Sequence, residues 1–187
     1  MLDDLQLIKF IKEGRLEAFE ALMSKYKDRV YNIAFSFTAS RSESGDISQN
    51  VFLKVYSNLK SFEEKSAFST WLYRITVNEC YNGLKKRKNN ILSLDAEINK
   101  DENNCLKDII EDKSGNIEET ALSKEMQLKV RKAILELPDK YRMIITLRDI
   151  EDMPYEQISE IMKISQNKVK IWIFRARNKL RNKLKNI

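Results

Sequence analysis

The stretch YEQISEIMKISQNKVKIWIFRARNKLRNKL, residues 155–184, decides the fold of the last third of this chain. Its apolar residues repeat at helical spacing, stop over residues 163–165, and resume in a longer helix that begins at Gln166. They are Tyr155, Ile158, Ile161 and Met162 before the break and Val169, Trp172, Ile173, Ala176 and Leu180 after it. This pattern predicts a helix-turn-helix.

The second helix of this pair concentrates basic residues on the side opposite its apolar stripe. That side carries Lys168, Lys170, Phe174, Arg175, Arg177, Lys179 and Arg181. A short helix that supports a longer basic helix is the usual way to place side chains in the major groove of DNA. The pattern leaves open a second interpretation, a solvated basic helix at a protein terminus.

The charge is distributed in three blocks along the 187 residues. Residues 1–88 carry a net charge of +4, residues 89–120 a net charge of −6, and residues 121–187 a net charge of +8. The overall charge of +6 favours a polyanionic partner without identifying one. The acidic block is also polar and rich in Asn, and it predicts a flexible linker.

Helical periodicity dominates both basic blocks, and with four Gly and two Pro little interrupts long helices. We therefore expect an all-α fold, with two small helical domains, 1–88 and 121–187, joined by the linker 89–120. Pro138 and Pro154 mark helix starts in the second domain. In the first domain we expect helices over 3–13, 15–36, 45–59 and 66–88.

The composition excludes several classes of site. The chain has no His, so a His-based catalytic triad and a His-ligated zinc are excluded. Cys80 and Cys105 lack the paired spacing of a metal site or a disulfide framework, and no Gly-rich phosphate loop is present. No apolar run approaches the roughly 20 residues of a membrane span. We expect a cytoplasmic protein that has no metal, cofactor or small-molecule substrate, does not insert into membranes, and is not an enzyme.

The segment DISQNVFLKVYSNLKSF, residues 46–62, predicts an amphipathic helix with an unusual outer face. Its inward residues are Ile47, Val51, Val55 and Leu59, joined by Phe52 and Tyr56. Its outer residues are Asp46, Gln49, Asn50, Leu53 and Ser57. An exposed Leu among acidic and amide groups could dock a protein partner, although single exposed Leu residues are common.

The segment SAFSTWLYRITVNECYNGLKKRK, residues 66–88, predicts a helix with Phe68, Leu72 and Ile75 inward. A different face carries Trp71, Arg74, Asn78, Tyr81 and Lys85. Rings that stack on bases, amides that bond base edges and cations that meet phosphates suit single-stranded nucleic acid. The equally weighted alternative is that the two aromatic residues belong to the core and that residues 85–88 form a solvated helix end.

In this order, the segments resemble an RNA polymerase sigma factor of the extracytoplasmic-function type, a group that keeps only the domains called region 2 and region 4. Asp46, Gln49 and Phe52 match the pattern Asp-x-x-Gln-Glu-x-Phe of the family's polymerase-docking helix, with Asn50 in place of Glu. FSTWLYRITVN, residues 68–78, is similar to the family's strand-opening segment.

The C-terminal third carries the rest of the resemblance. AILELP (133–138) and YRMIITLRD (141–149) resemble the start of region 4, and VKIWIFRAR (169–177) resembles its DNA-reading helix. The chain departs from the family at Lys168, Ile171 and Trp172, where Thr, Ser and Arg are frequent. These departures concern which promoter sequence is read.

The resemblance implies a role for each segment. Core RNA polymerase would be bound by Asp46, Gln49, Asn50, Leu53, Lys54 and Ser57. The melted promoter strand would be bound by Ser61, Lys65, Trp71, Arg74, Asn78, Tyr81, Asn82 and Lys85. The upstream promoter duplex would be bound by Asn167, Lys168, Lys170, Ile171, Phe174, Arg175 and Arg177.

The resemblance also implies partners: core polymerase, promoter DNA and an anti-sigma factor. The acidic linker would thread towards the RNA exit path of the polymerase. Three alternatives come from other classes: a sensor-type helix-turn-helix regulator that acts without core polymerase, a carboxylate-metal nuclease and a helical adaptor protein. The aromatic and basic face of residues 66–88 argues against the first, and the absence of clustered Asp or Glu outside the linker argues against the second.

Overall fold

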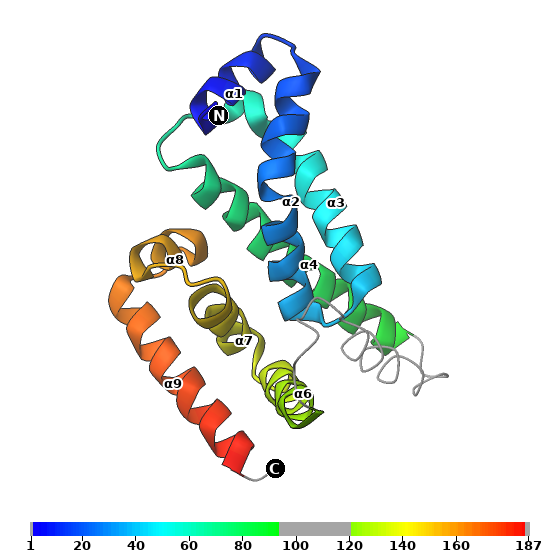
Figure 1. The fold of residues 1–187 in the computed structure, drawn as a ribbon, viewed down its shortest axis with the longest axis vertical. Helices are drawn as coiled ribbons and strands as arrows, with labels where there is room; N and C mark the ends of the chain where they lie inside the picture. The colour runs from blue at the N-terminus through cyan, green and yellow to red at the C-terminus, as the bar shows by residue number, and fades with distance from the viewer. Residues whose placement is uncertain (1, 94–120, 186–187) are drawn as a thin grey trace.

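The computed structural model describes residues 2–93 and 121–185, and every regular element in these two ranges is helical (Figure 1). The first unit consists of α1 (Asp4–Lys12), α2 (Leu16–Thr38), α3 (Arg41–Asn58), the 3₁₀ turn η1 (Leu59–Ser61) and α4 (Phe68–Ser93). The second unit consists of α6 (Ala121–Leu135), α7 (Asp139–Ile145), the π-helical turn η2 (Thr146–Ile150), α8 (Tyr155–Met162) and α9 (Gln166–Lys185). The expected all-α fold is confirmed.

Local capping sets the starts of α1 and α3 in the first unit. Asp3 accepts a hydrogen bond from the backbone N–H of Gln6 at 2.8 Å, and the Gln6 side chain accepts one from the N–H of Asp3 at 3.2 Å, a capping box. Ala39 takes a left-handed conformation (φ 55°) that ends α2, and the Ser40 hydroxyl then caps α3. This cap makes α3 begin at Arg41, four residues before the predicted start at 45.

The core of the first unit lies between α2, α3 and α4. Ile47, Val51, Val55 and Leu59 are buried, as their spacing predicts. Tyr56, which we expected to point inward, is 56% exposed, so this expectation is wrong. Its position is 100° around the helix from Val55, which places its ring at the rim of the core, edge-on to Phe19 with centroids 4.9 Å apart.

The second unit contains the predicted helix-turn-helix. Pro138 and Pro154 directly precede α7 and α8, which confirms that both mark helix starts. Lys163 ends α8 in a left-handed conformation (φ 53°), and the Ser165 hydroxyl accepts a hydrogen bond from the backbone N–H of Lys168 at the start of α9. The apolar stripe packs inward as predicted, with buried side chains at Ile158, Ile161, Val169, Ile173 and Ala176.

The two units pack against each other. α4 contacts α8, and α2 contacts α6 and η2 (Figure 1). The buried apolar residues of both units form one continuous cluster. Of the predicted linker, residues 94–120 lie outside the described residues, whereas residues 89–93 continue α4 past the expected end at 88. No helix within 2–93 or 121–185 has the length and apolarity needed to cross a bilayer.

Candidate functional site

The predicted docking face lies on the outer side of α3. Its six residues are all exposed, and Leu53, at 66%, is among the most exposed large apolar side chains of the described chain. The face points outward because Ile47, Val51 and Val55 hold the opposite side of α3 in the core. Two flanking members have local partners: the Ser57 hydroxyl donates to the Leu53 carbonyl at 3.0 Å, and Lys54 forms an ion pair with Glu79 of α4 at 2.6 Å.

An apolar extension of this face escaped the sequence analysis. Tyr56 is exposed one turn beyond Leu53, and its ring contacts the half-buried Phe19 of α2. Leu16, one turn before Phe19, is 56% exposed. The i, i+3 spacing of Leu53 and Tyr56 is the signal that could have found this surface, because residues three apart are neighbours on a helix.

Several predicted strand-binding residues lie at the N-terminal end of α4 and just before it. Trp71 is half-buried, with its ring 5.2 Å from that of Phe62 and 5.8 Å from that of Phe68, so it packs partly as a core residue. The Ser61 hydroxyl donates to the Asn58 carbonyl at 2.8 Å. Lys65 is exposed and forms an ion pair with Glu63. Trp71, one of the two aromatic residues expected to stack on bases, is therefore already partly packed within the protein.

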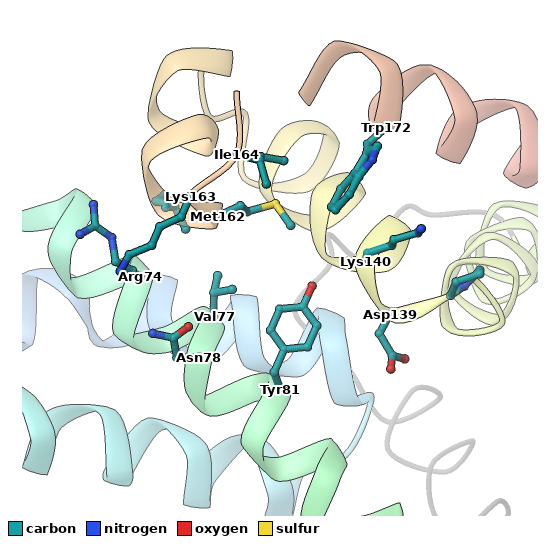
Figure 2. Close-up of a pocket in the computed structure, with 12 residues that line it drawn as sticks. Arg74, Val77, Asn78, Tyr81, Asp139, Lys140, Met162, Lys163, Ile164 and Trp172 are labelled. Carbon is teal, nitrogen blue, oxygen red and sulfur yellow. The ribbon is translucent and has the colours of Figure 1, made fainter. Parts of the chain in front are cut away.

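The remaining strand-binding residues divide into two groups. Asn82 and Lys85 are exposed, and the Asn82 amide donates to Glu79 at 3.0 Å. Arg74, Asn78 and Tyr81 line a pocket of about 540 Å³ between the two units (Figure 2), where Arg74 and Tyr81 are half-buried and Asn78 is exposed. The facing wall of this pocket comes from the second unit and includes Lys140, Met162, Lys163, Ile164 and Trp172.

Tyr81 shows how closely the second unit approaches α4. Burial, followed by the negative charge of Asp139 at the start of α7, raises the pKa of the Tyr81 hydroxyl to about 12. The periodicity of α4 predicted an open aromatic and polar face, and it could not indicate that α8 and the start of α7 lie against part of it. Lys140, Met162 and Lys163 were absent from the predicted site for the same reason.

The predicted duplex-binding face of α9 is open. Its seven residues are all exposed, and they include two large apolar side chains, Phe174 at 67% and Ile171 at 49%. Lys170 and Arg175 have no ion-pair partner among the described residues, so their charges are available to phosphates or base edges.

Two other cations of this face have partners within the unit. The Arg177 guanidinium donates to the carboxylate of Asp149, with Nε 3.2 Å from Oδ2. Lys168 lies over the ring of Trp172, with Nζ 5.1 Å from the centroid. Lys170, Phe174 and Arg175 therefore form the least constrained part of the basic helix.

Comparison with known proteins matches both units to one family. The family model described as "Sigma-70 region 2" matches residues 22–90, and the one described as "Sigma-70, region 4" matches residues 127–180. The chain is 34% identical over 180 residues to the ECF RNA polymerase sigma factor SigW of Bacillus subtilis (strain 168), with 96% of each chain covered. It is 36% identical over 188 residues to the ECF RNA polymerase sigma-E factor of Haemophilus influenzae (strain ATCC 51907 / DSM 11121 / KW20 / Rd), with 98% of this chain and 96% of the relative covered.

Solved structures share the fold at lower identity. The sigma factor RpoE of Bartonella quintana, in complex with the anti-sigma factor NepR, superposes with a TM-score of 0.69 at 23% identity, covering 89% of this chain and 96% of that one. CnrH, in complex with the cytosolic domain of CnrY, superposes with a TM-score of 0.71 at 20% identity, covering 98% and 97%.

Proposed function

Because the chain belongs to the extracytoplasmic-function sigma factors of the sigma-70 family, we propose that it binds core RNA polymerase and directs promoter-specific initiation of transcription. The observation that carries this proposal is the open face of α9, where Lys170, Phe174 and Arg175 project from a helix held by the helix-turn-helix core. This face combines cations with an exposed aromatic ring. Contact with DNA in the major groove explains it better than a purely solvated helix does, because an apolar Phe side chain is not stabilised by exposure to water.

Each surface would take one step of initiation. Residues 1–88 would act as region 2, which docks on core polymerase through the outer face of α3 and then captures bases of the melted promoter element through α4. Residues 121–187 would act as region 4, which reads the upstream duplex through α9. Capture of an extruded base must offset an unstacking cost of a few kcal/mol, which stacking and amide hydrogen bonds can supply.

The specific roles of the α4 residues follow from their chemistry. The amide of Asn78 can both donate to and accept from a base edge, and the Tyr81 ring offers a stacking surface. Arg74 and Lys85 would neutralise phosphates. Trp71 contributes mainly by fixing the first turns of α4, since its ring packs on Phe62 and Phe68.

The proposal implies three partners and no chemistry of the chain's own. The polymerase would carry out RNA synthesis in the cytoplasm, and the chain would contribute binding and strand separation. RpoE and CnrH are each seen in complex with a second protein, an anti-sigma factor in the case of RpoE. We extend this to the present chain and propose that an anti-sigma factor holds it inactive.

Run-off transcription tests the proposal directly. Purified chain is added to core polymerase on fragmented genomic DNA, and specific transcripts that depend on both components are expected. A sensor-type helix-turn-helix regulator would bind promoter DNA yet would neither copurify with core polymerase nor produce transcripts with it. The absence of any transcript on every genomic template would overturn the proposal.

A further inference from the structure

Trp172 lies at one edge of the duplex-binding face of α9. With about 100° of rotation per residue, Ile171 points nearly opposite the buried stripe of α9, whereas Lys168 and Trp172 lie about a quarter turn from that stripe. Trp172 is half-buried, and its ring stands edge-on to the buried ring of Tyr141 on α7, with centroids 6.4 Å apart. The core of the second unit therefore fixes the indole and leaves part of it exposed.

Two lysines from different helices gather at this ring. The Nζ atom of Lys168, at the start of α9, lies 5.1 Å from the ring centroid of Trp172. The Nζ atom of Lys140, at the start of α7, lies 5.4 Å from the same centroid and 5.0 Å from the centroid of Tyr141. Figure 2 shows Lys140 beside Trp172. The ring attracts both ammonium groups and so limits the positions that these long side chains take.

The charges of the two lysines are not neutralised by the parts of the chain that the structure describes. Lys140 and Lys168 are exposed, and neither has a carboxylate partner among the described residues. Asp139, next to Lys140 in the sequence, forms an ion pair with Arg142 at 3.7 Å. An aromatic ring orients a cation and leaves its full charge, which a carboxylate would cancel. Two like charges that are held together without a counterion attract an anion.

The position of these charges matches the wall of a DNA groove. The major groove is about 12 Å wide and a helix with its side chains is about 10–12 Å across, so a helix in this groove has a sugar-phosphate backbone on each side. Side chains opposite the buried stripe then reach bases, and side chains at the edges of the face reach phosphates. Lys168 lies at one edge, Lys140 extends this edge onto α7, and Lys170 lies at the other edge.

We propose that Lys140 and Lys168, positioned by Trp172, form a phosphate clamp that binds one strand of the promoter duplex beside the base pairs that α9 reads. Lys140 binds phosphate from outside the DNA-reading helix, and Trp172 is a positioning residue that acts through the two lysines. The inference rests on the proposed function for the identity of the anion as a DNA phosphate. The attraction of anions to the clamp is a property of the free chain and can be measured without DNA.

The first experiment measures anion attraction at the ring by fluorescence quenching. The chain has two Trp residues, so Trp71→Phe leaves Trp172 as the only indole reporter. Iodide, an anionic quencher, is compared with neutral acrylamide at constant ionic strength. Lys140→Gln and Lys168→Gln are each expected to lower quenching by iodide about twofold and to leave quenching by acrylamide unchanged, because only the anion responds to the charge.

Lys132→Gln is the matched control for the quenching experiment. Lys132 is exposed on α6 in the same unit and lies near Glu136, which pairs with Lys183 towards the end of α9. Its loss should change quenching by neither reagent. Equal iodide quenching with and without the two lysines would overturn the clamp. A parallel fall in iodide and acrylamide quenching would also overturn it, because the exposure of the ring would then have changed rather than the charge beside it.

The second experiment measures binding of fluorescein-labelled duplexes of two unrelated sequences by anisotropy at several salt concentrations. Lys140→Gln is expected to weaken binding roughly threefold to fivefold on both sequences and to lower the salt dependence by about one ion, as for the loss of one phosphate contact. Lys140→Arg keeps the charge and should keep the salt dependence. A salt dependence of Lys140→Gln equal to that of the unaltered chain would overturn the contact.

Trp172→Leu tests the positioning role, because Leu keeps an apolar side chain against Tyr141 and removes the aromatic ring. In this background Lys140→Gln is expected to weaken duplex binding less than it does in the unaltered chain, since the lysine is no longer held in place. Trp172→Phe keeps a ring and should retain most of this coupling. If Trp172 only supported the fold, Lys140→Gln would have the same effect with and without the ring, and that additivity would overturn its positioning role.

Failure of the clamp and failure of the proposed function give different results. A chain that supports initiation, while its iodide quenching and its duplex binding are independent of both lysines, would refute the clamp and leave the proposed function intact. A chain in which both measurements depend on the two lysines, yet which supports no initiation with core polymerase, would refute the proposed function and leave the clamp intact.

Discussion

The strand-binding face of α4 and the duplex-binding face of α9 look alike in sequence and differ in the fold. Both were predicted from basic and aromatic residues opposite an apolar stripe. On α9 the predicted duplex-binding side chains Lys170, Phe174 and Arg175 are exposed. On α4 the second unit contacts part of the face: Arg74 and Tyr81 are half-buried and line a pocket between the units, whereas Asn78, in the same lining, is exposed.

The difference lies in how many sides of each helix are apolar. The buried positions of α9, Val169, Ile173 and Ala176, fall on one stripe and leave the other side free. Along α4, by contrast, burial continues around the helix and includes Leu72, Tyr73, Thr76, Val77 and Cys80. A helix with apolar positions on several sides is buried on several sides.

The largest expected effect concerns a face that is open like that of α9. Leu53→Asp should weaken binding to core polymerase by about 2–4 kcal/mol, because a central apolar contact is replaced by a charge that must lose its water. The measurement is a titration of labelled chain with core polymerase. Leu5→Asp, at a leucine that is 51% exposed on α1, is the matched control and should bind as the unaltered chain does.

The Leu53→Asp variant should keep the helical circular-dichroism signal of the unaltered chain, because Leu53 is 66% exposed and contributes little to the core. Unchanged affinity for core polymerase together with unchanged helicity would show that the outer face of α3 is not the docking face.

Arg175→Ala tests the open face of α9 directly. If Arg175 makes a bidentate base contact, binding to the preferred upstream duplex should fall by about 1–3 kcal/mol and discrimination at one base pair should be lost. If it meets only phosphate, binding should fall equally on all sequences and the salt dependence should decrease by about one ion. Both are measured by anisotropy with labelled duplexes at several salt concentrations.

The control for Arg175→Ala is Arg181→Ala, the same substitution further along α9, which should leave sequence discrimination unchanged. Should Arg175→Ala alter neither affinity nor salt dependence, the residue would lie outside the interface. The exposed face of α9 would then not be a DNA-binding face at Arg175, and the comparison with α4 would no longer apply there.

Asn78→Ala tests the face of α4 that lines the pocket between the units and should have a smaller effect, about 1 kcal/mol, the usual contribution of one hydrogen bond. It should slow promoter opening several-fold and leave closed-complex binding unchanged, as followed by permanganate footprinting of a mapped promoter. On a premelted template the defect should persist with the natural base and shrink when that base is replaced by an abasic site. A lowered melting temperature with a defect indifferent to the base would instead indicate a structural role for Asn78.

The sequence was sufficient for the helices themselves. Periodicity located the helix-turn-helix and its break at residues 163–165, since an apolar stripe must face a core and the stripe is interrupted there. The start of α3 was missed because Ser40 was not recognised as its cap. Tyr56 was misplaced because a large aromatic residue next to Val55 fits either the core or its rim.

The packing of the two units was beyond the sequence argument. It joins residues more than a hundred positions apart, such as Arg29 with Glu151 and Phe37 with Arg142, and no local period encodes such pairs. The available signal was that Val77 and Cys80 are apolar although they lie outside the predicted inward set Phe68, Leu72 and Ile75. It indicated a second partner for α4 and did not identify it.

The smallest expected effect concerns the contact that holds α4 against α3 in its own unit. Lys54 of α3 forms an ion pair with Glu79 of α4 at 2.6 Å, with the Lys54 side chain half exposed. Surface ion pairs contribute roughly 0–1 kcal/mol, because solvent screens the charges and two long side chains must be ordered. Lys54→Gln should therefore lower the free energy of unfolding by no more than about 1 kcal/mol, as measured by urea denaturation.

Lys60→Gln, at an exposed lysine on η1, is the control for the loss of one positive charge. The carboxylate of Glu79 would also keep its hydrogen bond from Asn82 at 3.0 Å, which limits the loss further. A loss of several kcal/mol would mean that charge, rather than the burial of Leu72, Val77 and Cys80, holds α4 in place.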